Sequence, residues 1–374
     1  MSGSVDLLSA EAFPYVVLLV GLGTLYTLIT GAITFGLSRR ARPKPDNSFP
    51  SVTVVVCAHN EADRIGPCLE ALSSQTFDDS RRQIILVDDR STDGTGDIAR
   101  SWTDRLPLTV LEVEDGMLAC PKKNALALAL EASTGDLILT TDADCTPGPG
   151  WVASTVAAFG EGTGAVIGSA PLTDTGGRWA PLFVFQSMLV NALAAGSAGI
   201  GFPLACSGRN LAYRREAYLD AGGYAPIGHI VGGDDVLLMR RIRAAGWHID
   251  YNHDPDAAVT SPVHSDRQWQ RQIRYQSKAR HYGGRVLSLA ILVYIFHLLL
   301  LVSPVVGALE PSILPILWPV LIVKATVDGV FLWRAARRLG YRKMMRWFPL
   351  VEVLTVPYVT VFCALGTLRP ISWN

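Results

Sequence analysis

Residues 136–144 read D-L-I-L-T-T-D-A-D, and this stretch decides the fold that we expect for the chain. Its apolar and β-branched run, residues 137–141, is typical of a buried strand. Asp142 and Asp144 follow the run at once, with one small residue between them. Open α/β sheets bind ligands at the carboxyl ends of their parallel strands, and two carboxylates there suit a hard divalent cation. A solvated acidic turn is the alternative that a lone D-x-D pattern leaves open.

Strands and helices alternate before this stretch. The patterns predict strands at 51–57, 83–87 and 108–113 and helices at 63–75 and 121–133. This order indicates an α/β fold with a parallel, doubly wound sheet. Acids follow the ends of three of its strands: Glu61, then Asp88 and Asp89, then Asp142 and Asp144. We therefore expect a cluster of carboxylates at one edge of the sheet.

The second half of this region carries weaker signals. Residues 179–193 are apolar and predict an interfacial helix or a buried core helix. Residues 209–224 indicate a strand, a helix and a Gly-Gly break, and residues 232–246 a helix that starts at Asp234 and Asp235. These two acids suit the positive end of a helix dipole, so a simple capping role is the alternative to a functional one. Residues 267–280 form a basic segment with interleaved aromatic residues.

The composition suggests a chain with a soluble part and a membrane part. Of its 374 residues, 49% are hydrophobic and only 18% are charged. The formal net charge at pH 7 is zero, which gives no case for a nucleic-acid partner. The six cysteines show neither a C-x-x-C pair nor a zinc spacing, so we expect reduced thiols in the cytosol.

Four uncharged or nearly uncharged segments are long enough to span a bilayer: 12–38, 286–309, 311–333 and 347–368. Basic residues follow the first segment and fill the loop 334–346, which by the positive-inside rule lies in the cytosol. The prediction is a multi-pass protein of the cell (inner) membrane with both termini outside. It divides into an anchor (1–38), a linker (39–50), a cytosolic catalytic domain (51–285, with the interfacial helix at about 178–195) and a membrane region (286–374). Lys324 and Asp328, one turn apart, are expected to pair and to snorkel towards the membrane surface.

Six motifs, taken in order, resemble those of family-2 glycosyltransferases, which have the GT-A fold. They are C-A-H-N-E-A (57–62), V-D-D-R-S-T-D-G-T (87–95), P-K-K-N-A-L (121–126), T-D-A-D (141–144), S-G-R-N-L-A-Y-R-R (207–215) and G-D-D-V-L-L (233–238). The resemblance covers about residues 51–278. It implies a Rossmann-like GT-A domain with one membrane helix before it and about three after it.

The resemblance also implies a role for each matching residue. The first loop, with Ala58 and Glu61, would hold the nucleotide of a UDP- or GDP-linked sugar donor, and Asp88, beside Asp89, would hold its base. Lys122 would face the sugar-nucleotide. Asp142 would approach the ribose and a metal, and Asp144 would bind that metal, Mg²⁺ or Mn²⁺. Asp235 would be the general base, with Asp234 as the other candidate.

The chain departs from the family pattern in the basic segment. The family's Q-x-x-R-W element appears as R-Q-I-R-Y (271–275), whose Arg271, Arg274 and Tyr275 are expected to line the donor site. The resemblance implies a metal-dependent, inverting enzyme of the hexosyltransferase type that acts on a lipid or glycan acceptor. The change in this element and the small number of spans favour the addition of one sugar rather than of a growing chain. A processive polysaccharide synthase and a catalytically inactive membrane scaffold are the alternatives.

Overall fold

The computed structural model describes residues 12–39, 50–114, 118–263, 272 and 278–368. These residues fall into two compact units. Unit 1 takes the described residues of 1–35 and 267–370, and unit 2 takes those of 36–266.

Unit 2 is built on a seven-stranded sheet with the strand order β3-β2-β1-β4-β8-β6-β9. The strands are β1 (Val52–Ala58), β2 (Arg82–Asp88), β3 (Leu108–Glu112), β4 (Leu137–Asp142), β6 (Thr163–Ile167), β8 (Leu211–Arg214) and β9 (His248–Tyr251). All neighbouring strands are parallel except β8, which runs antiparallel to both β4 and β6. The expected parallel sheet therefore contains one reversed strand. A second sheet has the order β5-β10-β7, with β5 (Thr146–Pro147), β7 (Leu172–Thr173) and β10 (Val259–Pro262).

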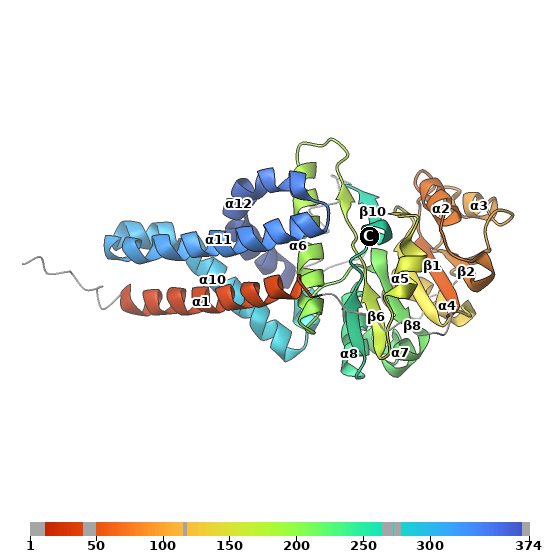
Figure 1. The fold of residues 1–374 in the computed structure, drawn as a ribbon, viewed down its shortest axis with the longest axis horizontal. Helices are drawn as coiled ribbons and strands as arrows, with labels where there is room; N and C mark the ends of the chain where they lie inside the picture. The colour runs from red at the N-terminus through yellow and green to blue at the C-terminus, as the bar shows by residue number, and fades with distance from the viewer. Residues whose placement is uncertain (1–11, 40–49, 115–117, 264–271, 273–277, 369–374) are drawn as a thin grey trace, which may run out of the picture. The chain divides into compact units, whose positions relative to one another are not determined.

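Helices cover both faces of the large sheet in unit 2 (Figure 1). They are α2 (Ile65–Ser73), α3 (Thr95–Arg100), α4 (Pro121–Ala132), α5 (Trp151–Ala157), α6 (Ala180–Gly199), α7 (Arg215–Asp220) and α8 (Val236–Ala244). Alternate residues of β1, such as Val54 and Val56, form one core cluster with α2 and α5, while α4 packs against β1 and β2. β1 is buried on both faces, which explains its nearly continuous β-branched sequence.

Helix α6 confirms the helix expected at 179–193 and extends beyond it, to Gly199. Its polar side chains bind the neighbouring segment of unit 2. Asn191 accepts a hydrogen bond from the backbone of Ala170 (2.9 Å), and Ser187 accepts one from the backbone of Leu172 (3.1 Å). These bonds favour the core-helix alternative for this segment.

Short 3₁₀ helices complete the two units: Asp79–Arg81, Gly208–Asn210, Ala225–Ile227, Pro255–Ala257, Lys278–His281, Pro311–Ile313 and Arg342–Trp347.

Unit 1 is a bundle of long apolar helices (Figure 1). They are α1 (Ala12–Gly36, nearly all of it in this unit), α10 (Gly284–Leu309), α11 (Leu314–Arg338) and α12 (Phe348–Leu368). These four helices correspond to the four expected spans. By length and composition, five helices of the described residues could cross a membrane, because α6 meets the same criteria.

A charged cluster lies inside unit 1. The Lys324 ammonium donates to Asp328 on its own helix (2.8 Å) and to Glu352 on α12 (2.6 Å). The Tyr26 hydroxyl of α1 donates to the other oxygen of Asp328 (2.7 Å). The expected Lys324–Asp328 ion pair is present. The Lys324 side chain does not extend to the surface as expected, because it is only 3% exposed. Side chains from α1, α11 and α12 bond within this cluster and keep it inside the bundle.

We expect Lys324→Met to destabilise unit 1 strongly. The substitution leaves the buried carboxylate of Asp328 facing the half-buried carboxylate of Glu352, and breaking a buried ion pair by removing one partner costs about 3–5 kcal/mol. Thermal unfolding in detergent micelles measures the effect, with Lys343→Met, at an exposed lysine, as the matched control. Adding Asp328→Asn and Glu352→Gln to Lys324→Met should recover part of the loss. Equal melting temperatures for the two single variants would contradict the role given to this cluster.

Candidate active site

The register of the central strands brings the predicted acids to one edge of the sheet. Ala58, the last residue of β1, pairs with Asp88 at the end of β2. On the other side of β1, Cys57 pairs with Asp142 at the end of β4. Because these strands are parallel, their last residues lie in one row, so Asp88 and Asp142 flank β1 on the same edge. The next residues of each loop project from that edge.

Lys122, in the first turn of α4, joins two of the acidic segments. Its ammonium lies 2.5 Å from an oxygen of Asp142 and 3.4 Å from an oxygen of Asp234. Burial opposes the positive charge, but Asp142 and Asp234 outweigh that effect and raise the pKa of Lys122 well above its ordinary value. The site therefore contains a permanent positive charge between carboxylates that come from distant parts of the sequence.

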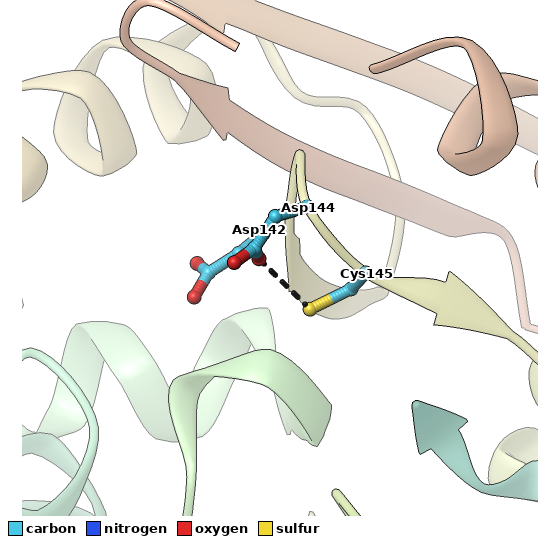
Figure 2. Close-up of side chains that lie close together, drawn as sticks. All are labelled: Asp142, Asp144 and Cys145. Atoms are coloured by element: carbon cyan, nitrogen blue, oxygen red, sulfur yellow. Dashed lines mark hydrogen bonds between the residues drawn. The ribbon is translucent and has the colours of Figure 1, made fainter. Parts of the chain in front are cut away.

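Asp142 and Asp144 form the part of the site that can hold a metal ion (Figure 2). Oxygens of these two carboxylates and the sulfur of Cys145 all lie within 4.8 Å of one another. Both carboxylates are half-buried, and carboxylate oxygens are the ligands that Mg²⁺ and Mn²⁺ prefer. The residues present therefore fit a hard divalent ion.

Cys145 is a neighbour of this pair that the sequence motifs do not single out. Its thiol donates to an oxygen of Asp144 (3.4 Å), as Figure 2 shows. Burial, reinforced by the charges of Asp142 and Asp144, raises the pKa of Cys145 well above its ordinary value. The Cys145 thiol thus acts as a hydrogen-bond donor beside Asp144. Burial also raises the pKa of Cys57 and that of Cys68 to about 12, and all six cysteines are free, as expected.

Asp88 lies in a separate pocket of about 280 Å³ beyond the ends of β2 and β3. Asp88 is only 6% exposed. Its carboxylate accepts a hydrogen bond from the backbone N–H of Ser91 (3.1 Å). The other carboxylate oxygen lies 2.5 Å from where a Cβ on Gly96 would be, so Gly96 has no room for a side chain. Arg100 and Glu112, which bond to each other, line the outer part of the pocket. A flat ring with an N–H group would find an acceptor in Asp88.

Asp234 and Asp235 differ in their surroundings. Asp234 is buried and faces Lys122, as described above. Asp235 caps α8: one of its oxygens accepts from the backbone of Val236 (2.7 Å), and the other accepts from the backbone of Gly208 (3.2 Å). Gly232 and Gly233 before them have φ angles of 74° and 70°, in the left-handed region that favours glycine. The predicted capping role of Asp235 is therefore present, and it fixes the carboxylate beside Gly208.

Gly208, within the predicted S-G-R-N segment, completes the site. A Cβ at Gly208 would lie 3.1 Å from a carboxylate oxygen of Asp234 and 3.5 Å from the nitrogen of Lys122. Its carbonyl accepts a hydrogen bond from Thr140 of β4 (3.0 Å). Gly208 is thus packed among the charged side chains, a closeness that the sequence motif alone did not reveal.

The other predicted residues lie at the margin of this arrangement or outside the described residues. Asp89 binds Arg90 (2.9 Å), and its backbone N–H donates to the carbonyl of Ala58 (2.8 Å). The Glu61 carboxylate accepts from Arg64 (2.8 Å), so one of its oxygens is engaged with a cation. The three predicted residues of the basic segment lie outside the described residues: Arg271, Arg274 and Tyr275.

Comparison with known proteins supports the resemblance to family-2 glycosyltransferases for residues 53–220. Residues 53–220 match the family model "Glycosyl transferase family 2". The chain is 29% identical over 213 residues to Glycosyltransferase AglE of Haloferax volcanii, a match that covers 56% of this chain and 66% of the relative. It is 27% identical over 242 residues to an N-acetylglucosaminyltransferase of Rhizobium leguminosarum bv. viciae, a match that covers 61% of this chain and 55% of the relative. The matched parts thus span between about half and about two thirds of these relatives.

The fold has a solved counterpart. The mannosyltransferase PcManGT from Pyrobaculum calidifontis, solved in complex with GDP-Man and Mn²⁺, aligns over 97% of this chain and 98% of its own with a TM-score of 0.57 and 22% identity. That likeness supports the GT-A type of fold expected for unit 2. Residues 53–220 thus match glycosyltransferase family 2, and within the same unit the acids lie in a row at the carboxyl edge of the sheet.

Proposed function

We propose that the chain is a membrane-bound, metal-dependent, inverting glycosyltransferase that moves one sugar from a nucleotide-sugar donor to a hydroxyl group of a lipid-like acceptor. The observation that carries this proposal is the junction at Lys122. There, the D-x-D strand end and the G-G-D-D segment, about 90 residues apart in the sequence, both reach the same ammonium within salt-bridge distance. The junction puts a candidate metal site and a candidate base next to one another.

The donor would lie along the carboxyl edge of the sheet. Asp88 would accept a hydrogen bond from the base in its pocket, and Asp142 and Asp144 would hold Mg²⁺ or Mn²⁺ near the diphosphate. A divalent ion, when bound, would neutralise the charge that develops on the departing diphosphate. The Lys122 ammonium supplies a second positive charge at this point, fixed by Asp142 and Asp234. The mannosyltransferase of similar fold was solved with a nucleotide-sugar and Mn²⁺, which supports this arrangement.

The acceptor would approach from the side of Gly208 and α8. An acceptor hydroxyl is a weak nucleophile, so a base must take its proton as it attacks the sugar. Asp235 is the better candidate, because Asp234 is buried against Lys122, whereas Asp235 is oriented by two backbone N–H groups. Attack in line, opposite to the leaving diphosphate, inverts the anomeric carbon. Asp234 would then keep Lys122 in place.

The helices of unit 1 support a membrane location. The positive-inside rule puts the loop between α11 and α12, and with it the catalytic domain, on the cytosolic side. An enzyme held there is well placed for an acceptor that is itself a membrane lipid and for soluble nucleotide-sugars of the cytosol.

The direct test is sugar transfer by the purified protein in lipid nanodiscs. We expect one radiolabelled sugar from a panel of UDP- and GDP-linked donors to appear in the lipid extract, once per acceptor, only when Mg²⁺ or Mn²⁺ is present. A ladder of oligosaccharides would instead support the processive alternative. No transfer from any donor, with nucleotide still bound, would support the inactive scaffold.

Asp235→Asn should lower the turnover number by roughly 10²–10⁴-fold, because it keeps the shape of the side chain and removes the base. Nucleotide affinity should stay close to that of the wild type, since Asp88, Asp142 and Asp144 lie on other segments. Initial rates at saturating donor and calorimetric titration with the nucleoside diphosphate measure the two quantities. Asp234→Asn is the matched comparison: it should be milder and should act through Lys122. If Asp235→Asn turns over at a near-normal rate, or loses the nucleotide, Asp235 is not the base.

An introduced cysteine tests the topology. Gly340, in the loop between α11 and α12, has a φ angle of 83° that would strain a cysteine, so the exposed Lys343 is the better position. In intact cells, an impermeant maleimide should leave Lys343→Cys unlabelled and should label Leu309→Cys, at the exposed opposite end of the bundle. Labelling of Lys343→Cys from outside would overturn the predicted orientation.

A further inference from the structure

Lys123, next to Lys122 in α4, has no role in the proposed reaction so far, and its surroundings are unusual. The residue is 0% exposed. Its ammonium donates to the carbonyl oxygens of Ile227 (2.6 Å) and Ile230 (2.8 Å). Burying an ammonium costs free energy unless its hydrogens are bonded, so each of these carbonyls matters for keeping Lys123 inside.

The carbonyls that Lys123 binds belong to the segment that leads directly to the two candidate acids. Only Val231, Gly232 and Gly233 separate Ile230 from Asp234. Both glycines are held at positive φ, and a Cβ on Gly233 would lie 2.7 Å from the side chain of Leu237. A short and tightly packed connection of this kind transmits the position of Ile230 to Asp234 and Asp235.

A second contact fastens the same segment to the start of α4. The backbone N–H of Ala119 donates to the carbonyl of Gly228 (3.1 Å). A Cβ on Gly228 would clash with the side chain of Leu118, so the two chain segments touch closely. The segment 227–230 is therefore held against the N-terminal end of α4 by both backbone and side-chain hydrogen bonds.

We propose that Lys123 is a positioning residue, which sets the distance between the donor side of the site and the acids Asp234 and Asp235. The two consecutive lysines have different roles, because Lys122 contacts the acids themselves and Lys123 holds the backbone that carries them. This inference rests on the proposed function, because it concerns the base of that reaction. A misplacement of about 1 Å in a catalytic group can cost on the order of 10²-fold in rate.

A purely structural role is the competing explanation, and the chain offers a matched control for it. Arg215 also donates to main-chain carbonyls near α4, but at the opposite end of that helix: to Gly135 (3.0 Å) and Ser133 (2.6 Å). Its own backbone N–H donates to the carbonyl of Asp136, before the start of β4 and far along the strand from Asp142. Losing Arg215 removes similar bonds without touching the acids.

The experiment compares Lys123→Met, Lys123→Arg and Arg215→Met in the full-length protein. Three quantities are measured: the melting temperature, the dissociation constant of the nucleoside diphosphate with Mn²⁺, and the turnover number at saturating donor. Lys123→Met should lower turnover at least about tenfold while the dissociation constant changes less than about threefold. Lys123→Arg, which keeps the donors, should recover part of the turnover. Arg215→Met should lower the melting temperature with turnover within about twofold of the wild type.

Two results would overturn the inference while leaving the proposed function intact. One is an active wild type with unchanged turnover in Lys123→Met. The other is a parallel loss of turnover and nucleotide affinity, which would make Lys123 a general scaffold residue. If Lys123→Met does not fold, Gly232→Ala replaces it, because the strain of an alanine at this φ angle should move the acids. It should lower turnover while the dissociation constant of the nucleoside diphosphate changes little. Unchanged turnover in Gly232→Ala also overturns the inference. A wild type that transfers no sugar from any donor would instead remove the proposed function, and the inference with it.

Discussion

The rest of the site depends on the ion pairs that the Lys122 ammonium makes with Asp142 and Asp234. Asp142 is half-buried and Asp234 is buried, and without a cation between them their charges would push the D-x-D strand end and the G-G-D-D segment apart. The favourable Coulomb interaction at 2.5 Å and 3.4 Å outweighs the cost of burying the lysine, which is why its pKa rises rather than falls. The helix that carries Lys122 also carries Lys123 one residue on, so one turn of α4 organises both sides of the site.

Much of the fold followed from local sequence patterns. The β-branched runs at β1, β2 and β4 and the alternation with α2 and α4 indicate a parallel sheet, because strands buried on both faces have such sequences. The reversal of β8 and the small sheet of β5, β7 and β10 did not follow. β8 joins the sheet after a connection through α6, and a strand pattern carries no information on its direction; β5 and β7 are two residues each, too short to show a period.

The position of the site was predictable, but its internal contacts were not. Asp88 and Asp142 had to share an edge once their strands were parallel and in register. The sequence motifs did not single out three residues of this region: Gly208, Cys145 and Lys123. The contacts that make each of them important come from residues distant in the sequence or from side-chain geometry, which a motif does not reveal. The Lys324–Asp328 pair was expected from its spacing, yet its burial depends on Glu352 and Tyr26, from two other helices.

The central claim is that the carboxylates at the end of β4 hold a divalent ion against the diphosphate of a nucleotide. Electron–nuclear double resonance of Mn²⁺ bound to the purified protein with UDP or GDP tests this most directly. The account predicts a hyperfine coupling between Mn²⁺ and ³¹P that is lost in Asp144→Asn and kept in Asp136→Asn, a control just before the start of β4. Bound Mn²⁺ without ³¹P coupling, or a coupling that survives Asp144→Asn, would contradict it.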